Sequence, residues 1–183
     1  MDDAEKSHYR NKMRQRPSPE DIVEPGPGQE SVWDYPRPPR VVRISNAGRV
    51  LLESRVIAAS KGLLKVMETA SPPTYYFPPG DVDVSCLLES ERRTFCEWKG
   101  EARYWHVKVG GTLVENAVWS YPDPLEDSGD CAQLRGYFAF YSYELECFLA
   151  DQRIDPQQGG FYGGWITPDI TGPFKGAQGT KEW

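Results

Sequence analysis

Three polar residues have side chains that could carry out chemistry: Glu68, Cys96 and Lys99. A carboxylate can act as a general base, a thiol can act as a nucleophile, and a lysine can contact an anion or a carbonyl oxygen. Glu68 is expected at the end of a strand, where it would either face a cavity or cap a turn. Lys99 would lie in a surface row of ion pairs, unless a bulge at Gly100 turned it toward the neighbouring aromatic residues.

Six aromatic residues are candidates for the wall of a ligand pocket. Such rings bind planar or cationic ligands by stacking and cation-π contacts, each worth ~0.5 to 2 kcal/mol. They could instead fill a core that has few aliphatic side chains, but Gly100, Ala102 and Ala117 leave room among them. The candidate ligand-binding residues are therefore Tyr75, Tyr76, Trp98, Lys99, Tyr104, Trp119 and Tyr121.

Cys96 and His106 are a thiol and an imidazole that could together make a nucleophile. On one unbroken strand, ten residues would separate them by roughly 33 Å, so they could not touch. We expect His106 to face Glu115 on the next strand instead. With 2 histidines and 4 widely spaced cysteines, the sequence has no metal-ligand spacing, so neither a metal nor a cofactor is expected.

The element that must position most of these residues is a hairpin over residues 95–121, with its turn at Gly110-Gly111. Counting outward from the turn places Val107 opposite Val114 and Tyr104 opposite Ala117. Because side chains alternate across a strand, one face would collect valines and Trp105 as a core. The other face would collect the rings of Trp98, Tyr104, Trp119 and Tyr121 around a hollow.

The rest of the chain predicts further short strands around this hairpin. The expected elements are a hairpin of strands 40–45 and 49–54, a loop followed by a strand ending at Glu68, an extended edge segment over 71–79, a strand within 134–143 covered on both faces, and a short helix over 144–151.

Length and composition indicate one domain with a core rich in large rings. The chain has 183 residues, of which 13% are aromatic. Residues 1–30 are charged and rich in proline and read as a flexible tail, whereas residues 31–155 form a single β-rich domain. Residues 156–183 are a Gly- and aromatic-rich extension that we expect to lie against the domain or against a protein partner.

The charge balance argues against a nucleic-acid partner, since the formal net charge is -6. No apolar run approaches the ~20 residues of a membrane helix, and the N-terminus lacks the apolar core of a signal peptide. We therefore expect a cytoplasmic protein that has reduced thiols and binds no membrane.

Four separated motifs resemble a known family: residues 33–39 (Trp-Asp-Tyr-Pro-Arg-Pro-Pro), Glu68-Thr69 followed by Pro72 to Tyr76, Cys96 to Ala102 followed by Tyr104-Trp105, and Ala117 to Pro122. Their types and order are similar to the domain-of-unknown-function family 427 (DUF427). The resemblance implies a mainly β, single compact antiparallel domain with one or two short helices and irregular tails. This fold is similar to the β-tent group, which includes the cereblon thalidomide-binding domain, methionine sulfoxide reductase B and Mss4-like proteins.

The resemblance implies little about activity, because the family is uncharacterised and carries only a nucleotidyltransferase-type label. Many relatives have His where this chain has Ser71 and Pro where it has Glu97. If that His were catalytic, this member would be impaired. Many β-tent proteins also carry structural zinc, for which this chain lacks the cysteines.

The leading hypothesis is a non-catalytic β module that binds a small planar or heterocyclic molecule in the aromatic pocket. The first alternative is an enzyme, resembling a nucleotidyltransferase or a hydrolase, that acts on a nucleotide or acyl substrate with Glu68, Cys96 and Lys99 as working groups. No Gly-rich phosphate-binding motif supports nucleotidyl transfer. The second alternative is an interaction protein that uses its C-terminal extension in a larger assembly.

Overall fold

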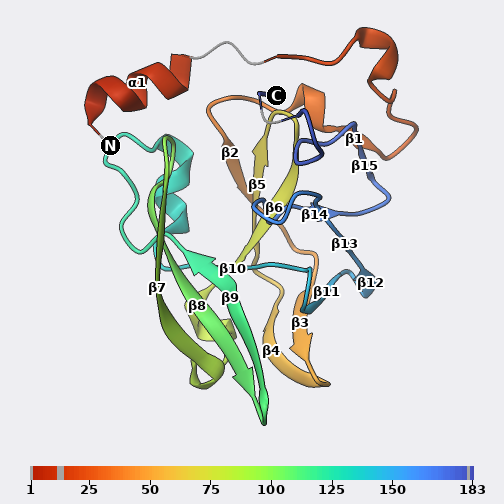
Figure 1. Cartoon of the computed structure of the whole chain (residues 1–183). Helices are drawn as coiled ribbons and strands as arrows, with labels where there is room; N and C mark the ends of the chain where they lie inside the picture. Colours follow the sequence, from red (N-terminus) through yellow and green to blue (C-terminus); the bar gives the residue numbers. More distant parts are fainter. Residues whose placement is uncertain (1, 12–14, 181) are drawn as a thin grey trace.

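Two antiparallel sheets make up most of the structure, a computed structural model that describes residues 2–11, 15–180 and 182–183 (Figure 1). The larger sheet has seven strands in the order β2-β5-β6-β10-β9-β8-β7. The expected mainly β, antiparallel fold is confirmed. The strands of this sheet are β2 (Arg40–Arg43), β5 (Leu64–Glu68), β6 (Ser71–Phe77), β7 (Leu87–Cys96), β8 (Gly100–Val109), β9 (Thr112–Ser120) and β10 (Phe138–Phe140).

The smaller sheet has four strands in the order β12-β11-β3-β4 and lies at the lower right of Figure 1. Its strands are β3 (Gly48–Leu52), β4 (Arg55–Ser60), β11 (Glu146–Leu149) and β12 (Gln152–Arg153). Two further pairs join short strands: β1 (Glu30–Ser31) with β15 (Ile170–Thr171), and β13 (Asp155–Pro156) with β14 (Trp165–Ile166).

Within the residues that the structure describes, helical structure is limited to short segments. One α-helix, α1 (Asp3–Asn11), lies within the predicted flexible tail. The remaining helical segments are 3₁₀ turns: η1 (Pro19–Asp21), η2 (Val32–Asp34), η3 (Pro79–Asp81), η4 (Val84–Cys86) and η5 (Gly129–Leu134).

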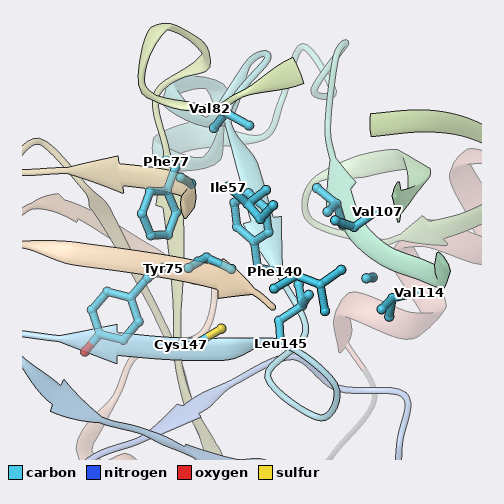
Figure 2. Packing of buried hydrophobic residues seen from close by; sticks show 14 of the residues in the cluster. Ile57, Tyr75, Phe77, Val82, Val107, Val114, Phe140, Leu145 and Cys147 are labelled. Atoms are coloured by element: carbon cyan, nitrogen blue, oxygen red, sulfur yellow. The ribbon is translucent and has the colours of Figure 1, made fainter. Parts of the chain in front are cut away.

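The main core contains side chains from both sheets (Figure 2). Ile57 of β4 and Phe77 of β6 are both fully buried there, with Val107 of β8 beside them. Trp105 packs against this core, its ring centroid 5.2 Å from that of Phe138. The valines and Trp105 of the 95–121 segment therefore lie on one face of the sheet, as the alternation predicts.

The opposite face of the seven-stranded sheet carries a second cluster of buried side chains. Tyr76, Ala139 and Trp119 belong to it, although their chain neighbours Phe77, Phe140 and Val118 belong to the main core. The second cluster also contains Tyr104, Tyr121, Ala102, Val41, Leu64, Val66, Cys131 and Leu134.

The segment predicted to be a single strand from Phe95 to Val109 is two strands. Strand β7 ends at Cys96, and Cys96 pairs with Gly100 at the start of β8. Gly100 has a φ of +102°, a backbone conformation that favours glycine and permits the tight reversal. Cys96 and His106 therefore lie on different strands, and His106 pairs with Leu88.

The pairing of β8 with β9 follows the predicted register only near the Gly110-Gly111 turn. Val107 lies opposite Val114, but farther from the turn Tyr104 lies opposite Trp119 and not opposite Ala117. The difference comes from a bulge at Asn116, which has a φ of +53°. The backbone N–H of Asn116 donates to Nδ1 of His106 at 3.0 Å, in place of the expected pair of His106 with Glu115.

Two predicted elements are wrong: the hairpin of strands 40–45 and 49–54, and the helix over residues 144–151. The two strands of the expected hairpin correspond to β2 and β3, which belong to different sheets. They separate because Val41 of β2 packs in the second cluster, whereas Val50 of β3 packs in the main core. The helix expected over residues 144–151 is strand β11. There, buried Cys147 and Leu149 alternate with less buried neighbours, which is the period of a strand.

The proline-rich segment 71–79 is extended, but it is not at an edge. Strand β6 lies between β5 and β10. Its prolines, Pro72 and Pro73, precede the two residues that pair with β10, Tyr76 and Phe77. Their missing N–H groups therefore remove no bond from that ladder.

The C-terminal extension was expected to lie against the domain or against a protein partner. In the structure, part of it packs against the domain. Trp165 is fully buried, and its ring centroid lies 5.4 Å from that of Tyr75 and 6.0 Å from that of Phe77. Its Nε1 donates to the backbone oxygen of Phe140 at 3.0 Å.

Candidate functional site

A cavity of about 320 Å³ opens on the face of the seven-stranded sheet that carries the second cluster. Residues of β5 to β9 line it, together with residues from α1 and from the C-terminal extension. Nine of its lining residues are aromatic, and five of them form what we call the aromatic wall: Tyr76, Tyr104, Trp119, Tyr121 and Tyr141. Four of the predicted ligand-binding rings therefore line one cavity.

Trp119 is the centre of the aromatic wall. Its Nε1 donates to Oη of Tyr76 at 3.2 Å, and its ring centroid lies 4.5 Å from that of Tyr141. Oη of Tyr104 is 2.8 Å from Oγ1 of Thr94. These bonds hold the rings in place, so the wall is formed before any ligand arrives.

A largely buried charged group lies beside this wall, formed by Arg37, Glu68 and Lys99. Nη2 of Arg37 lies 2.5 Å from Oε1 of Glu68, and Nζ of Lys99 lies 3.8 Å from Oε2 of the same carboxylate. Nζ of Lys99 also lies 5.9 Å from the ring centroid of Tyr121. Lys99 reaches this position because the turn between β7 and β8 points its side chain inward. It does not lie in a surface row of ion pairs, and it faces the aromatic residues, as expected for the case of a bulge at Gly100.

The charge states of this group follow from burial and from the neighbouring charges. Burial alone would raise the pKa of Glu68, but Lys99 and Arg37 outweigh burial and lower it. Burial alone would lower the pKa of Lys99, but Coulombic interactions with Cys96, when its thiol is ionised, and with the carboxylate of Glu68 outweigh burial and raise it. At neutral pH the group therefore holds a carboxylate, an ammonium and a guanidinium.

Cys96 also lines the cavity, so the structure brings together all three predicted catalytic candidates. Burial raises the pKa of the Cys96 thiol, and the charge of Lys99 offsets this only in part. The side chain is therefore a neutral thiol near pH 7 and not an activated thiolate.

Two predicted pocket residues lie elsewhere. Tyr75 points to the other face of β6 and packs in the main core against Trp165, because neighbouring residues in a strand point to opposite faces. Trp98 lies in the turn between β7 and β8, where the guanidinium of Arg10 stands 5.1 Å from its ring centroid. Neither residue lines the cavity.

Several residues of the site were not predicted from the sequence. Arg37 belongs to the first family motif, and Tyr141 belongs to the aromatic run 134–143, so both stood in regions already singled out. The contribution of the C-terminal extension was harder to foresee: Phe161, Tyr162 and Gly163 come from its glycine-rich loop. A Cβ at Gly163 would lie 2.1 Å from Cη2 of Trp119, so only glycine allows this approach.

The small residues that were expected to leave room do not form the cavity. A Cβ at Gly100 would meet Cγ of Leu125 at 3.3 Å, and Ala117 lies in the main core. The space lies instead beside Ser71, Thr74 and Thr94, which line it with short side chains.

Within the described part of the chain, no group of three or more His, Cys, Asp or Glu side chains could hold a metal ion. None of the helices in that part has the length and apolar character needed to cross a bilayer.

Comparison with known proteins agrees with the resemblance in the sequence. A family model described as a domain of unknown function (DUF427, NTP_transf_9) matches residues 40–151. No curated protein matches the chain. The matched region contains every strand of the seven-stranded sheet, together with Glu68, Cys96 and Lys99. Since the match covers more than half of its length, the chain belongs to the DUF427 family.

Proposed function

We propose that this protein is a binding module for a small planar molecule. The molecule would bind in the cavity on the face of the seven-stranded sheet that carries the second cluster. The observation that carries the proposal is the combination of a cavity of about 320 Å³ with five aromatic side chains on its wall. Small-molecule sites have volumes of about 300–1,000 Å³ and combine apolar walls with a few polar groups. A ligand of one or two fused rings suits this size.

The charge states of the polar groups favour binding over catalysis. A nucleophilic cysteine requires a lowered pKa, whereas that of Cys96 is raised. A general base requires a pKa near the working pH, whereas that of Glu68 is lowered by its two cationic partners. The group supports the holding of a ligand better than proton transfer or acyl transfer.

The C-terminal extension supports the same proposal, because part of it lies at the cavity. Phe161 and Tyr162 line the cavity, and the backbone oxygen of Phe161 accepts a hydrogen bond from Oη of Tyr141 at 2.9 Å. These contacts favour a role in the pocket over the alternative of a partner-binding arm. All 4 cysteines are unpaired, which suits the reducing cytoplasm that we propose as its location.

Ligand-observed NMR with a library of one- and two-ring compounds tests the proposal. The variant Trp119→Phe should weaken binding of every hit by about fivefold, because an indole contact is worth about 1 kcal/mol. Trp105→Phe is the matched control, since Trp105 lies on the opposite face of the same hairpin and packs against the main core. The proposal is wrong if the library contains no hit, or if the two variants weaken binding equally.

A further inference from the structure

Lys99 is 9% exposed and lines the cavity. The described residues place no acceptor within hydrogen-bond distance of its Nζ, and its nearest charged partner is Oε2 of Glu68 at 3.8 Å. An ammonium group carries three donors, and Nζ of Lys99 keeps accessible surface, so an acceptor in the cavity can reach it. Nζ of Lys99 can therefore donate hydrogen bonds to an acceptor on a bound ligand.

A second unpaired donor lies beside Lys99. Tyr121 is 7% exposed and lines the same cavity, with its ring centroid 5.9 Å from Nζ of Lys99. Within the described part of the chain its hydroxyl makes no hydrogen bond, and the oxygen is not fully enclosed, so an acceptor in the cavity can reach it. Burial raises the pKa of Tyr121 well above its ordinary value, so the hydroxyl keeps its proton and remains a donor.

The charges around these donors favour a ligand with a single negative charge. The cations Arg37 and Lys99 share the one carboxylate of Glu68, so within this group two positive charges face one negative charge. Glu97 and Glu182 also line the cavity and would repel a second negative charge on a ligand.

A third cation, Lys175, also lines the cavity but has a backbone partner. Its Nζ donates to the backbone oxygen of Trp183 at 2.7 Å. Among the described lining residues, donors without a hydrogen-bond partner thus lie at Lys99 and Tyr121, and Nε of Arg37 is a further, fully buried one.

We propose that the ligand is an aromatic carboxylate, whose ring lies against Trp119 and Tyr141 and whose carboxylate accepts hydrogen bonds from Lys99 and Tyr121. The inference rests on the proposed function, because it specifies the ligand class of the same cavity. The carboxylate completes the hydrogen bonds of both donors, and its single charge balances the local excess. A charge-assisted hydrogen bond of this kind is about twice as strong as a neutral one.

Isothermal titration calorimetry with three matched probes tests this inference: 2-naphthoate, its neutral analogue 2-naphthamide, and the dianionic 2-naphthyl phosphate. The wild-type protein should bind naphthoate at least about tenfold more tightly than naphthamide and more tightly than the phosphate. In Lys99→Met, the preference for naphthoate over naphthamide should fall to about one. Lys108→Met, which changes an exposed lysine of β8, should keep the full preference.

The outcomes separate this inference from the proposed function. Equal binding of naphthoate and naphthamide by the wild type overturns the carboxylate and leaves the aromatic pocket standing. Tighter binding of the phosphate also overturns it. Binding of no probe contradicts both proposals. If circular dichroism shows that Lys99→Met does not fold, Tyr121→Phe is tested in its place. This variant removes the hydroxyl of Tyr121, and an unchanged affinity for naphthoate would contradict the inference.

Discussion

At the scale of single residues, Glu68 links the two cations of the cavity. It accepts from Arg37 at 2.5 Å and lies 3.8 Å from Lys99, so its removal leaves two buried positive charges without a carboxylate. Removal of one partner from a buried ion pair is far more costly than loss of an exposed pair. The carboxylate is therefore a structural part of the site as well as a part of its chemistry.

The variant Glu68→Gln should lower the free energy of unfolding by about 3 kcal/mol at pH 7, as measured by urea denaturation. The matched control is Glu101→Gln, which changes an exposed glutamate of β8 that lies 4.0 Å from Nε of Arg93. This control should change the free energy by less than about 0.5 kcal/mol. Equal losses of unfolding free energy in the two variants would contradict the role of Glu68 as the shared carboxylate of Arg37 and Lys99.

The stabilising effect of Glu68 should depend on pH in acid. Because its pKa is lower in the folded protein than the ordinary value of 4.5, the effect is fully present above that value. It is then lost as the pH falls through the folded-state pKa. The difference in unfolding free energy between the wild type and Glu68→Gln should thus be constant from pH 6 to 8 and shrink below about pH 4.5. A difference that grows in acid would show the opposite shift.

Cys96 should react slowly with iodoacetamide at pH 7.5, because burial raises its pKa and little thiolate is present. Mass spectrometry of the alkylated peptide gives the rate, and the rate should rise as the pH passes 9. Lys99→Met should slow the reaction further, since the positive charge of Lys99 favours the thiolate. Rapid alkylation at pH 7 would favour the enzyme alternative instead.

At the scale of elements, the part of the site that could be predicted is the part governed by strand alternation. Tyr104, Trp119 and Tyr121 share a face opposite to Val107 and Val118, as the period of two requires. The same rule places Tyr75 and Tyr76 on opposite faces of β6, so only one of them could line the cavity. This limit was already visible in the sequence.

The remaining parts of the site depend on long-range contacts and on local backbone geometry. The turn between Cys96 and Gly100 requires a positive φ at Gly100, which the apolar pattern does not signal. The pairing of β2 with β5 joins strands that are distant in the sequence, so no local turn signal announces it. Arg37 reaches Glu68 only through this long-range packing.

The glycine-rich loop before β14 should tolerate no side chain at Gly163. In Gly163→Ala, the new Cβ would lie 2.1 Å from Trp119, so the loop or the indole must move, and we expect a loss of about 1–3 kcal/mol. Thermal unfolding and the emission maximum of tryptophan fluorescence measure the two effects. Gly80→Ala is the matched control, because a Cβ there meets open space and should change stability by less than about 0.5 kcal/mol. Wild-type stability and emission in Gly163→Ala would contradict the observed contact.

At the scale of the whole molecule, the two sheets and the C-terminal extension share one core. Trp165 of the extension packs against Tyr75 and Phe77 of the seven-stranded sheet, and these lie with Val50 of the four-stranded sheet in the same cluster. The extension also lines the cavity. The lining of the cavity and the core of the fold are therefore joined through the same segment.

Truncation after Pro156 should abolish cooperative unfolding, because the loss of Trp165 alone corresponds to about 3–5 kcal/mol. Differential scanning calorimetry gives the readout. Deletion of residues 1–14 is the control: α1 has mostly exposed side chains, so its loss should cost only about 1 kcal/mol. A truncated protein that still melts in one sharp transition would show that the extension is not part of the core.

The most direct test of the central claim is a crystal structure of the protein soaked or co-crystallised with 2-naphthoate. We expect the naphthalene ring against Trp119 and Tyr141, with the carboxylate within hydrogen-bond distance of Nζ of Lys99. An empty cavity, or a ligand bound only at another surface, would contradict the claim that this cavity is the binding site.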